Sequence, residues 1–273
     1  MGVMGKAYLF YNPLAGDGRI LEDLDALEFV LDETVVRCDM TKPETYEKAL
    51  FAMEPEDYFV VCGGDGTLNR FVNLTMELHR PNAVYYYPAG HHNDFARDFG
   101  RYYGCNPYCV TEHLCNLAKV RMDGRSGMLL TGILFLAEPK IRRICLDNRR
   151  YNDANTPKTM KLTVDGKSYR HTKVSFAAVM QGRHCGGGLI PDPDRRRTDD
   201  DLSCVIIHGC GSLYGKYLCR RLRKNRPIRS RHLEIHRGRE INITFDTPVQ
   251  LYTDGEIQTD VTEAMVTARE RRQ

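Results

Sequence analysis

Residues 58–72 read YFVVCGGDGTLNRFV, an apolar run followed by clustered glycines and a second apolar pattern. The run Tyr58–Cys62 predicts a short buried strand. After the turn Gly63–Thr67, side chains recur at helical spacing, at Leu68, Phe71, Val72, Thr75 and Leu78. Glycines let a backbone approach a ligand closely, and a helix N-terminus offers N–H groups to phosphate. Asp65 adds a carboxylate that suits Mg²⁺. The alternative is a tight turn that merely requires glycine.

The same succession of strand, loop and helix surrounds this stretch. Short apolar runs at Lys6–Tyr11, Glu33–Cys38 and Val84–Tyr87 predict three further strands, each followed by a loop and a helical pattern. Repeated units of this kind are typical of a parallel sheet with crossover helices. We therefore expect an α/β N-terminal nucleotide-binding domain with a parallel sheet.

The pattern changes after about Val120. Strands are expected at Met128–Leu136, Met160–Val164, Ser168–Arg170, Lys173–Met180, Leu202–His208, Glu240–Phe245 and Val249–Thr253. Asp165 and Gly166 predict a hairpin turn, and Ser212 to about Arg223 predicts a helix. This half predicts a C-terminal, mostly antiparallel β-sandwich domain.

The expected domains are residues 1–122 and 123–273, with the last residues free to return to the first domain. Because no low-complexity linker separates them, we expect the two domains to pack directly and share a cleft.

Composition excludes several classes of protein. The chain has 273 residues, 42% hydrophobic and 27% charged, with a net charge of +3, which is globular but too weakly basic to indicate nucleic-acid binding. Its ten cysteines form no CxxC pair, and no secretory signal precedes them, so free thiols in a reducing cytosol are expected. The longest apolar stretch, Met128–Ala137, is far shorter than the roughly 20 residues of a membrane span. A secreted disulfide scaffold, an integral membrane protein and a coiled coil are therefore excluded.

Two more loops follow strands of the first domain. Asn12–Gly16 reads NPLAG, and Pro88–Arg97 reads PAGHHNDFAR. Each alone could be an ordinary turn, but loops at the carboxyl ends of parallel strands meet at one edge of a sheet, where ligands bind. Near the C-terminus, Asp254-Gly255-Glu256 has by pattern alone the character of a hairpin turn.

In this order, NPLAG, GGDGTLN, the PxGxxNDFAR run, GGGLIP at Gly186–Pro191 and the late DGE resemble the diacylglycerol kinase catalytic-domain family. That family includes bacterial lipid kinases and sphingosine and ceramide kinases, and NAD kinases are more distant relatives that share GGDG. The resemblance runs from about Lys6 to Asp260. It implies an α/β nucleotide domain, a β-sandwich, ATP on the glycine-rich loops and Mg²⁺ at the phosphates.

Carried over position by position, the resemblance also assigns residues. The nucleotide would be lined by Asn12, Pro13, Leu14, Ala15, Gly16, Thr41, Gly63, Gly64, Asp65, Gly66, Thr67, Leu68, Asn69, His91 and Asn93. The catalytic residues would be Asp65 and Asp94 around the phosphates and magnesium, Glu256 as the base toward the lipid hydroxyl, and Asp254 beside it. A further, structural magnesium would lie near Arg196, Asp199 and Asp201, with Asp199 as the side-chain ligand.

The sequence departs from the family pattern at three places. His91 stands where a Thr is usual, Arg70 stands where a Glu is usual, and the DGxLD element reads DDDLS at Asp199–Ser203. The first two changes add a bulky imidazole and a positive charge beside the expected site. The third puts the structural metal in doubt.

A basic run completes the pattern. Seven basic residues occur in twelve positions, at Arg220, Arg221, Arg223, Lys224, Arg226, Arg229 and Arg231. They form either a solvated face or a patch that docks on an anionic bilayer, and without interleaved aromatics they do not indicate nucleic acid. We expect an ATP-dependent lipid kinase that acts on a membrane lipid such as diacylglycerol. It would lie in the cytoplasm, peripheral to the inner face of the membrane, with a homodimer left open.

Two other functions stay open at this point. One is an NAD kinase-like enzyme that phosphorylates a dinucleotide. The other is a catalytically decayed nucleotide- or lipid-binding protein, in which His91 and Arg70 mark the loss of activity.

Overall fold

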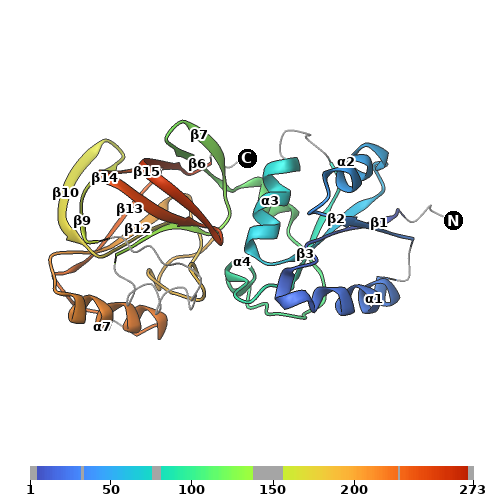
Figure 1. The fold of residues 1–273 in the computed structure, drawn as a ribbon, viewed down its shortest axis with the longest axis horizontal. Coiled ribbons are helices and arrows are strands. Elements are labelled where there is room, and N and C mark those ends of the chain that lie inside the picture. Colours follow the sequence, from blue (N-terminus) through green and yellow to red (C-terminus); the bar gives the residue numbers. More distant parts are fainter. Residues whose placement is uncertain (1–4, 32–33, 76–80, 138–155, 227, 270–273) are drawn as a thin grey trace. The chain divides into compact units, whose positions relative to one another are not determined.

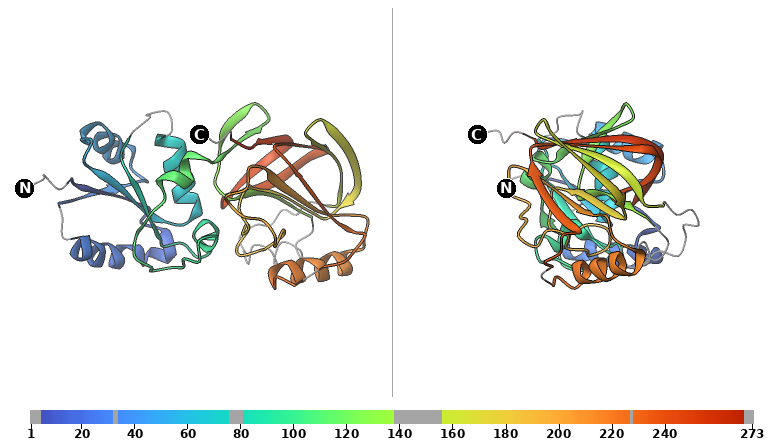
Figure 2. Two further views of the ribbon diagram at one scale, coloured as in Figure 1. Left: turned by 180° about the vertical axis from the view of Figure 1, so that it is seen from behind. Right: turned by 90° about the vertical axis from the view of Figure 1, so that its left-hand side faces the viewer.

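A computed structural model of the chain describes residues 5–31, 34–75, 81–137, 156–226 and 228–269. The chain divides into two compact units, Met1–Cys115 and Asn116–Gln273, and each is described here by itself (Figures 1 and 2). β6 (Ala118–Met122), which lay in the first of the two expected domains, pairs with strands of the second unit. The last described strand, β15 (Glu256–Thr267), also belongs to the second unit.

The first unit contains a five-stranded sheet in the order β2-β1-β3-β4-β5. Its strands are β1 (Ala7–Tyr11), β2 (Val35–Asp39), β3 (Tyr58–Gly63), β4 (Val84–Pro88) and β5 (Tyr108–Cys109). The first four are parallel, and β5 runs antiparallel to β4. The helical segments are η1 (Ala15–Gly18), α1 (Ile20–Leu31), α2 (Pro43–Ala52), α3 (Asp65–Thr75), α4 (Asp94–Arg97) and α5 (Thr111–Cys115). The α/β fold with a mostly parallel sheet is therefore confirmed.

Both faces of this sheet are covered, because its strands carry apolar side chains in both directions. On one face the rings of Phe10, Phe59 and Phe71 meet edge to face, with centroids 5.0 to 5.5 Å apart. On the other face Leu9 and Val60 join a buried cluster with α1. Burial on both faces explains the continuous apolar runs in these strands.

The second unit contains a ten-stranded, antiparallel sheet in which β13-β12-β11-β8-β14-β15-β6-β7 are successive neighbours and β9 pairs with β10 and β14. Besides β6 and β15, its strands are β7 (Arg125–Leu129), β8 (Gly132–Leu136), β9 (Lys158–Val164), β10 (Lys167–Val174), β11 (Phe176–Met180), β12 (Leu202–Ile207), β13 (Leu233–Gly238) and β14 (Glu240–Thr253). Helix α7 (Ser212–Arg223) is the expected helix.

The sheet folds over on itself around one apolar core. Met160 and Leu162 of β9 share a buried cluster with Val179 of β11 and Cys204 of β12, although β9 is not hydrogen-bonded to either strand. Two parts of the sheet therefore pack face to face, which is the expected β-sandwich. On the other face, Leu218 and Leu222 of α7 pack against Val205 and neighbouring strand residues (Figure 1).

Several expected strands differ in detail. The run Met128–Leu136 is not one strand, since β7 ends at Leu129 and β8 begins at Gly132. The interruption arises because the carboxylate of Asp254 accepts hydrogen bonds from the N–H groups of residues 130–132. The runs Glu240–Phe245 and Val249–Thr253 are one strand, β14, with a register shift between Thr244 and Val249. The hairpin turn at Asp165-Gly166 is confirmed, with both residues at positive φ.

Three strands of the second unit, β6, β13 and β15, were not predicted from the sequence. Much of each is exposed and polar, so the apolar pattern is weak. None of the helices in the described ranges combines the length and the apolar character that a bilayer crossing requires.

An ion pair with a buried carboxylate fastens the segment after Gly186–Pro191 to the sandwich. Asp192, whose side chain is 1% exposed, accepts hydrogen bonds from Arg237 Nε at 3.0 Å, Arg237 Nη2 at 2.8 Å and Ser203 Oγ at 2.6 Å. Burial by itself raises the pKa of Asp192, but the hydrogen bonds from Arg237 and Ser203 outweigh it, so the pKa is lowered. The folded unit therefore favours the ionised carboxylate.

This gives a pH prediction for stability. Because the pKa of Asp192 is lower in the folded state, its contribution is present above the unfolded value of about 3.9 and is lost as pH falls through the folded value. Asp192→Asn should reduce the free energy of unfolding by about 1–3 kcal/mol at pH 7. Denaturant unfolding between pH 7 and pH 2.5 should show this gap narrowing below about pH 4. Asp246→Asn, at an exposed position, is the control. A gap that stays constant with pH contradicts the assignment.

Candidate functional site

The loops that follow β1, β3 and β4 meet at one edge of the first sheet. A Cβ placed on Gly90 would lie 2.5 Å from the Cα of Gly64, so the loops after β3 and β4 touch through their glycines. Gly16, at φ +60°, is equally confined, because a Cβ there would lie 2.7 Å from the carbonyl oxygen of Ala89. The expected convergence of these three loops is observed, and it requires glycine at the contacts.

Asp65 joins the second loop to the third. It is the first residue of α3, and its carboxylate accepts hydrogen bonds from the N–H groups of Asp94 at 2.7 Å and Phe95 at 3.0 Å. These N–H groups belong to the first two residues of the short helix α4. Asp65 therefore caps the N-terminus of α4, although it belongs to a different part of the chain. This is a structural role that the sequence did not indicate.

Asn93 shapes the third loop. It is buried at φ +50°, its Oδ1 accepts the N–H of Gly90 at 2.9 Å, and its Nδ2 donates to the carbonyl of Gly90 at 2.7 Å. The side chain thus closes the turn that brings Gly90 against Gly64. Asp94, which follows it, is also buried, with 3% of its surface exposed.

The first loop is held by similar short contacts. Asn12 Oδ1 accepts the N–H of Leu14 at 3.0 Å, and the side chain of Leu14 is exposed. Asp17 Oδ2 lies 2.9 Å from His91 Nε2, so His91 connects the first loop to the third. Sequence reasoning identified His91 as a candidate but missed Asp17. The position of Asp17 inside the glycine-rich run is the feature that could have indicated it.

The remaining candidate residues of this unit differ in how exposed their side chains are. Thr41, after β2, is exposed, and its hydroxyl and N–H both donate to Asp39 Oδ1, at 2.6 and 2.8 Å. Arg70 is exposed on α3. The side chains of Ala15, Thr67 and Leu68 are buried, so these residues can meet a ligand mainly through their backbone. Of the other expected nucleotide contacts, Gly66 and Asn69 lie in α3, Pro13 precedes η1 and Gly63 ends β3.

This edge suits a phosphate group. An α-helix leaves the N–H groups of its first turn without intrahelical acceptors, and α3 begins at Asp65 directly after the glycine contact. Two carboxylates, those of Asp65 and Asp94, belong to the same joined loops. Backbone N–H donors beside carboxylate oxygens form a donor set that fits a nucleotide phosphate with Mg²⁺.

In the second unit, Asp254 and Glu256 lie at the hairpin turn between β14 and β15. Asp254 is buried and accepts hydrogen bonds from the N–H groups of Leu130 at 2.8 Å, Thr131 at 2.7 Å and Gly132 at 3.3 Å, and from Thr131 Oγ1 at 2.7 Å. Burial raises the pKa of Asp254, and these hydrogen bonds act against it. Asp254 thus anchors the turn, whereas Glu256, the first residue of β15, is exposed.

The loop that was expected to bind a structural metal ion contains a positively charged side chain, that of Arg195. The guanidinium of Arg195, which is buried, forms ion pairs with Asp199, at 3.8 Å, and with Asp201. Asp199 also accepts the N–H of Arg196 at 2.9 Å. Arg195 therefore supplies positive charge to both carboxylates. Arg195 was not predicted from the sequence, because the family pattern at this loop is recognised by its acidic residues. Magnesium at this loop stays a prediction.

The role of Asp65 as a cap can be tested by stability. Asp65→Asn keeps the size of the side chain but leaves one buried N–H of α4 facing an amide that cannot accept it. We expect the free energy of unfolding to fall by about 1–3 kcal/mol. Asp17→Asn is the matched control, because Asp17 is 70% exposed and pairs only at the surface, so its effect should stay within about 0.5 kcal/mol. Equal effects in chemical denaturation would contradict the capping role.

Comparison with known proteins agrees with this geometry. Residues 6–124 match the family model of the diacylglycerol kinase catalytic domain. Residues 151–269 match the model described as the YegS C-terminal NAD kinase β-sandwich-like domain. None of the curated proteins compared with the chain matches it.

Solved structures share the fold. A protein from Bacillus anthracis str. Sterne, provisionally assigned as a diacylglycerol kinase, has 18% identity and a TM-score of 0.69, with 98% of this chain and 95% of that chain covered. A second structure, described as a diacylglycerol kinase from the same organism, has 16% identity and a TM-score of 0.68, with 98% and 96% covered. At these identities the likeness shows the fold. The two family models, one for each part of the chain, show a diacylglycerol kinase catalytic domain followed by a YegS-like C-terminal domain, which places the chain in a diacylglycerol kinase-like family of kinases.

Proposed function

We propose that the protein is an ATP-dependent lipid kinase that transfers the γ-phosphate of ATP to the hydroxyl of a membrane lipid such as diacylglycerol. The observation that supports this most directly is the edge where the glycines of the loops after β3 and β4 touch, at the start of α3. Such an edge leaves room for phosphate against the backbone and supplies N–H donors to it.

Phosphoryl transfer depends mainly on position and charge. In the proposed role, the N–H groups at the start of α3 bind the phosphates, and Asp65 and Asp94 hold Mg²⁺. When bound, Mg²⁺ neutralises the phosphate oxygens during transfer. Asp65 performs this task from a fixed position, because its hydrogen bonds to Asp94 and Phe95 restrict its rotation.

The acceptor hydroxyl needs a base. Its oxygen forms a bond to the γ-phosphorus, the bond from that phosphorus to the bridging oxygen of ADP breaks, and the hydroxyl proton must be accepted by a side chain. Glu256 suits this role because it is exposed, while Asp254 fixes the turn that carries it. Asp254 is thus a positioning residue for Glu256.

Helix α7 supports a membrane surface as the place of reaction. Gly215, Leu218, Cys219 and Leu222 face the core, whereas Leu213 is 81% exposed and Tyr217 is 49% exposed. Arg220 is exposed further along the helix and Lys224 just after its end, and the guanidinium of Arg221 lies 5.9 Å from the centre of the Tyr217 ring. Exposed apolar and aromatic side chains beside basic ones are typical of a helix that lies at an anionic bilayer. We therefore propose attachment to the inner face of the cytoplasmic membrane.

The assay that tests the function also tests Glu256. The wild type should turn over ATP when mixed micelles contain a lipid alcohol, and diacylglycerol, sphingosine, ceramide and polyprenol are the acceptors to compare. Glu256→Gln should reduce this turnover by about 10²–10⁴-fold, because the amide cannot accept the proton. Glu240→Gln, at an exposed position of the same sheet, is the control.

Three results would contradict parts of this proposal. Phosphorylation of NAD in place of lipid indicates the NAD kinase-like alternative, whose β-sandwich the C-terminal model is described as resembling. Absence of turnover with every acceptor indicates a binding protein. Full turnover by Glu256→Gln removes this residue as the base.

Membrane attachment is tested separately. Replacing Arg220, Lys224 and Arg226 by Gln should weaken co-sedimentation with anionic vesicles by roughly a hundredfold at low salt, because each basic residue near the surface contributes about 1 kcal/mol. Turnover on a lipid dissolved in detergent should not change. The effect should shrink as salt rises, since the Debye length is about 10 Å at 0.1 M.

A matched variant controls for net charge. Arg125, Lys161 and Arg170 are exposed basic residues on strands of the same unit, and their replacement by Gln removes the same charge from other elements. If both triple variants bind vesicles equally well, the basic run is a solvated face.

A further inference from the structure

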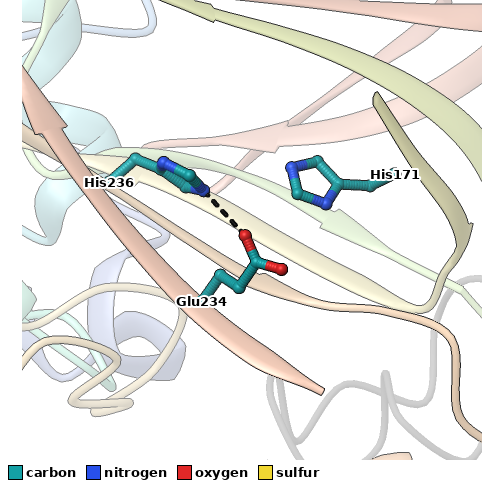
Figure 3. Close-up of side chains that lie close together, drawn as sticks. All are labelled: His171, Glu234 and His236. Carbon is teal, nitrogen blue, oxygen red and sulfur yellow. Dashed lines mark hydrogen bonds and ion pairs between the residues drawn. The ribbon is translucent and has the colours of Figure 1, made fainter. Parts of the chain in front are cut away.

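A cluster of imidazoles and one carboxylate lies in the second unit and includes none of the residues assigned above. His171 comes from β10, and Glu234 and His236 come from β13. One ligand atom from each residue lies within 4.8 Å of the others, and the three side chains point toward one another (Figure 3). Glu234 and His236 share a face of the strand because side chains repeat every second residue.

Glu234 is at the centre of this cluster. Its Oε2 lies 3.1 Å from His236 Nε2, and its Oε1 lies 2.8 Å from His208 Nε2. The carboxylate of Glu234 thus has an imidazole nitrogen at hydrogen-bond distance from each of its oxygens.

His171 gives an independent indication of a ligand. Its side chain is buried, with 5% of the residue exposed, and its Nε2 has no hydrogen-bond partner among the described residues. A buried polar atom left without a partner is unfavourable, so such an atom in a folded protein calls for an explanation. An unpartnered imidazole nitrogen of a neutral histidine carries a lone pair that can bind a metal ion.

We propose that His171, Glu234 and His236 bind a divalent transition-metal ion of the zinc class. Two imidazole nitrogens and one carboxylate oxygen are a known zinc donor set, which leaves a fourth position for water. Imidazole favours zinc, copper, iron or nickel over magnesium, which prefers oxygen ligands. His208 acts as a positioning residue, because its hydrogen bond orients the carboxylate of Glu234.

The geometry allows this coordination with small movements. Ligand atoms about 2.0–2.1 Å from a tetrahedral ion lie roughly 3.4 Å from one another. The side chains, now within 4.8 Å, would each move by on the order of 1 Å. Among the described strands β10 pairs with β9, and β13 pairs with β12, so no ladder joins β10 to β13. The ion would link two parts of the sandwich that the backbone leaves unconnected.

Metal binding by the full chain tests the proposal. After treatment with a chelator, the wild type should bind one Zn²⁺ in a calorimetric titration, and excess Mg²⁺ should not displace it. His171→Gln and His236→Gln should each weaken Zn²⁺ binding by at least tenfold, and His208→Gln by about 10- to 100-fold. His113→Gln, in α5 of the first unit, is the control and should bind as the wild type does.

Cobalt distinguishes this site from the thiols, because the nine described cysteines are not in disulfides and could also bind metal. Co²⁺ bound at the proposed site should show visible ligand-field bands without a thiolate charge-transfer band. The bands should disappear in His236→Gln, whose position is partly exposed and tolerates substitution. Circular dichroism under chelation confirms that each variant is folded. Unchanged affinity in both folded variants His171→Gln and His236→Gln, or a cobalt spectrum dominated by thiolate bands, would overturn the proposal.

Discussion

Two hydrogen bonds, from the N–H groups of Asp94 and Phe95 to the carboxylate of Asp65, set the arrangement of the candidate site in the first unit. They fix the start of α4 against the start of α3 and keep Gly90 in contact with Gly64. Asn93 then closes the turn from within the third loop. The edge that carries the candidate site therefore depends on a carboxylate that caps one helix and is itself the first residue of another.

The second unit uses a buried carboxylate in the same way. The carboxylate of Asp254 accepts hydrogen bonds from the N–H groups of residues 130–132. These bonds separate β7 from β8 and fix the turn before Glu256. Two of the four acids that resemble catalytic residues thus also organise the backbone. Loss of activity on replacing Asp65 or Asp254 cannot by itself establish a chemical role, because the surrounding loops would change too. Glu256 is exposed, so its replacement reports on chemistry more directly.

Features that depend on residues close together in the chain could be predicted from the sequence. The strand, turn and helix around GGDGT, the parallel order that follows from repeated crossovers, and helix α7 were all found. The sequence could not predict the break between β7 and β8, because the cause, Asp254, is more than 120 residues away from Leu130. Nor could it group His171 with Glu234 and His236, which only the folding of β9 and β10 over β12 and β13 brings together. Arg195 was missed for a similar reason, since its charge matters only beside Asp199 and Asp201.

The two metal chemistries proposed for the chain differ in the atoms that would bind them. The first unit offers carboxylate oxygens beside backbone N–H groups, a combination that suits magnesium together with phosphate. The cluster of the second unit offers imidazole nitrogens around one carboxylate, which suits a softer ion held by the protein alone. Magnesium at the first position would arrive and leave with the nucleotide, because the phosphates complete its coordination. An ion between His171 and His236 would instead stabilise the folded sandwich itself, since the unfolded chain does not assemble these ligands.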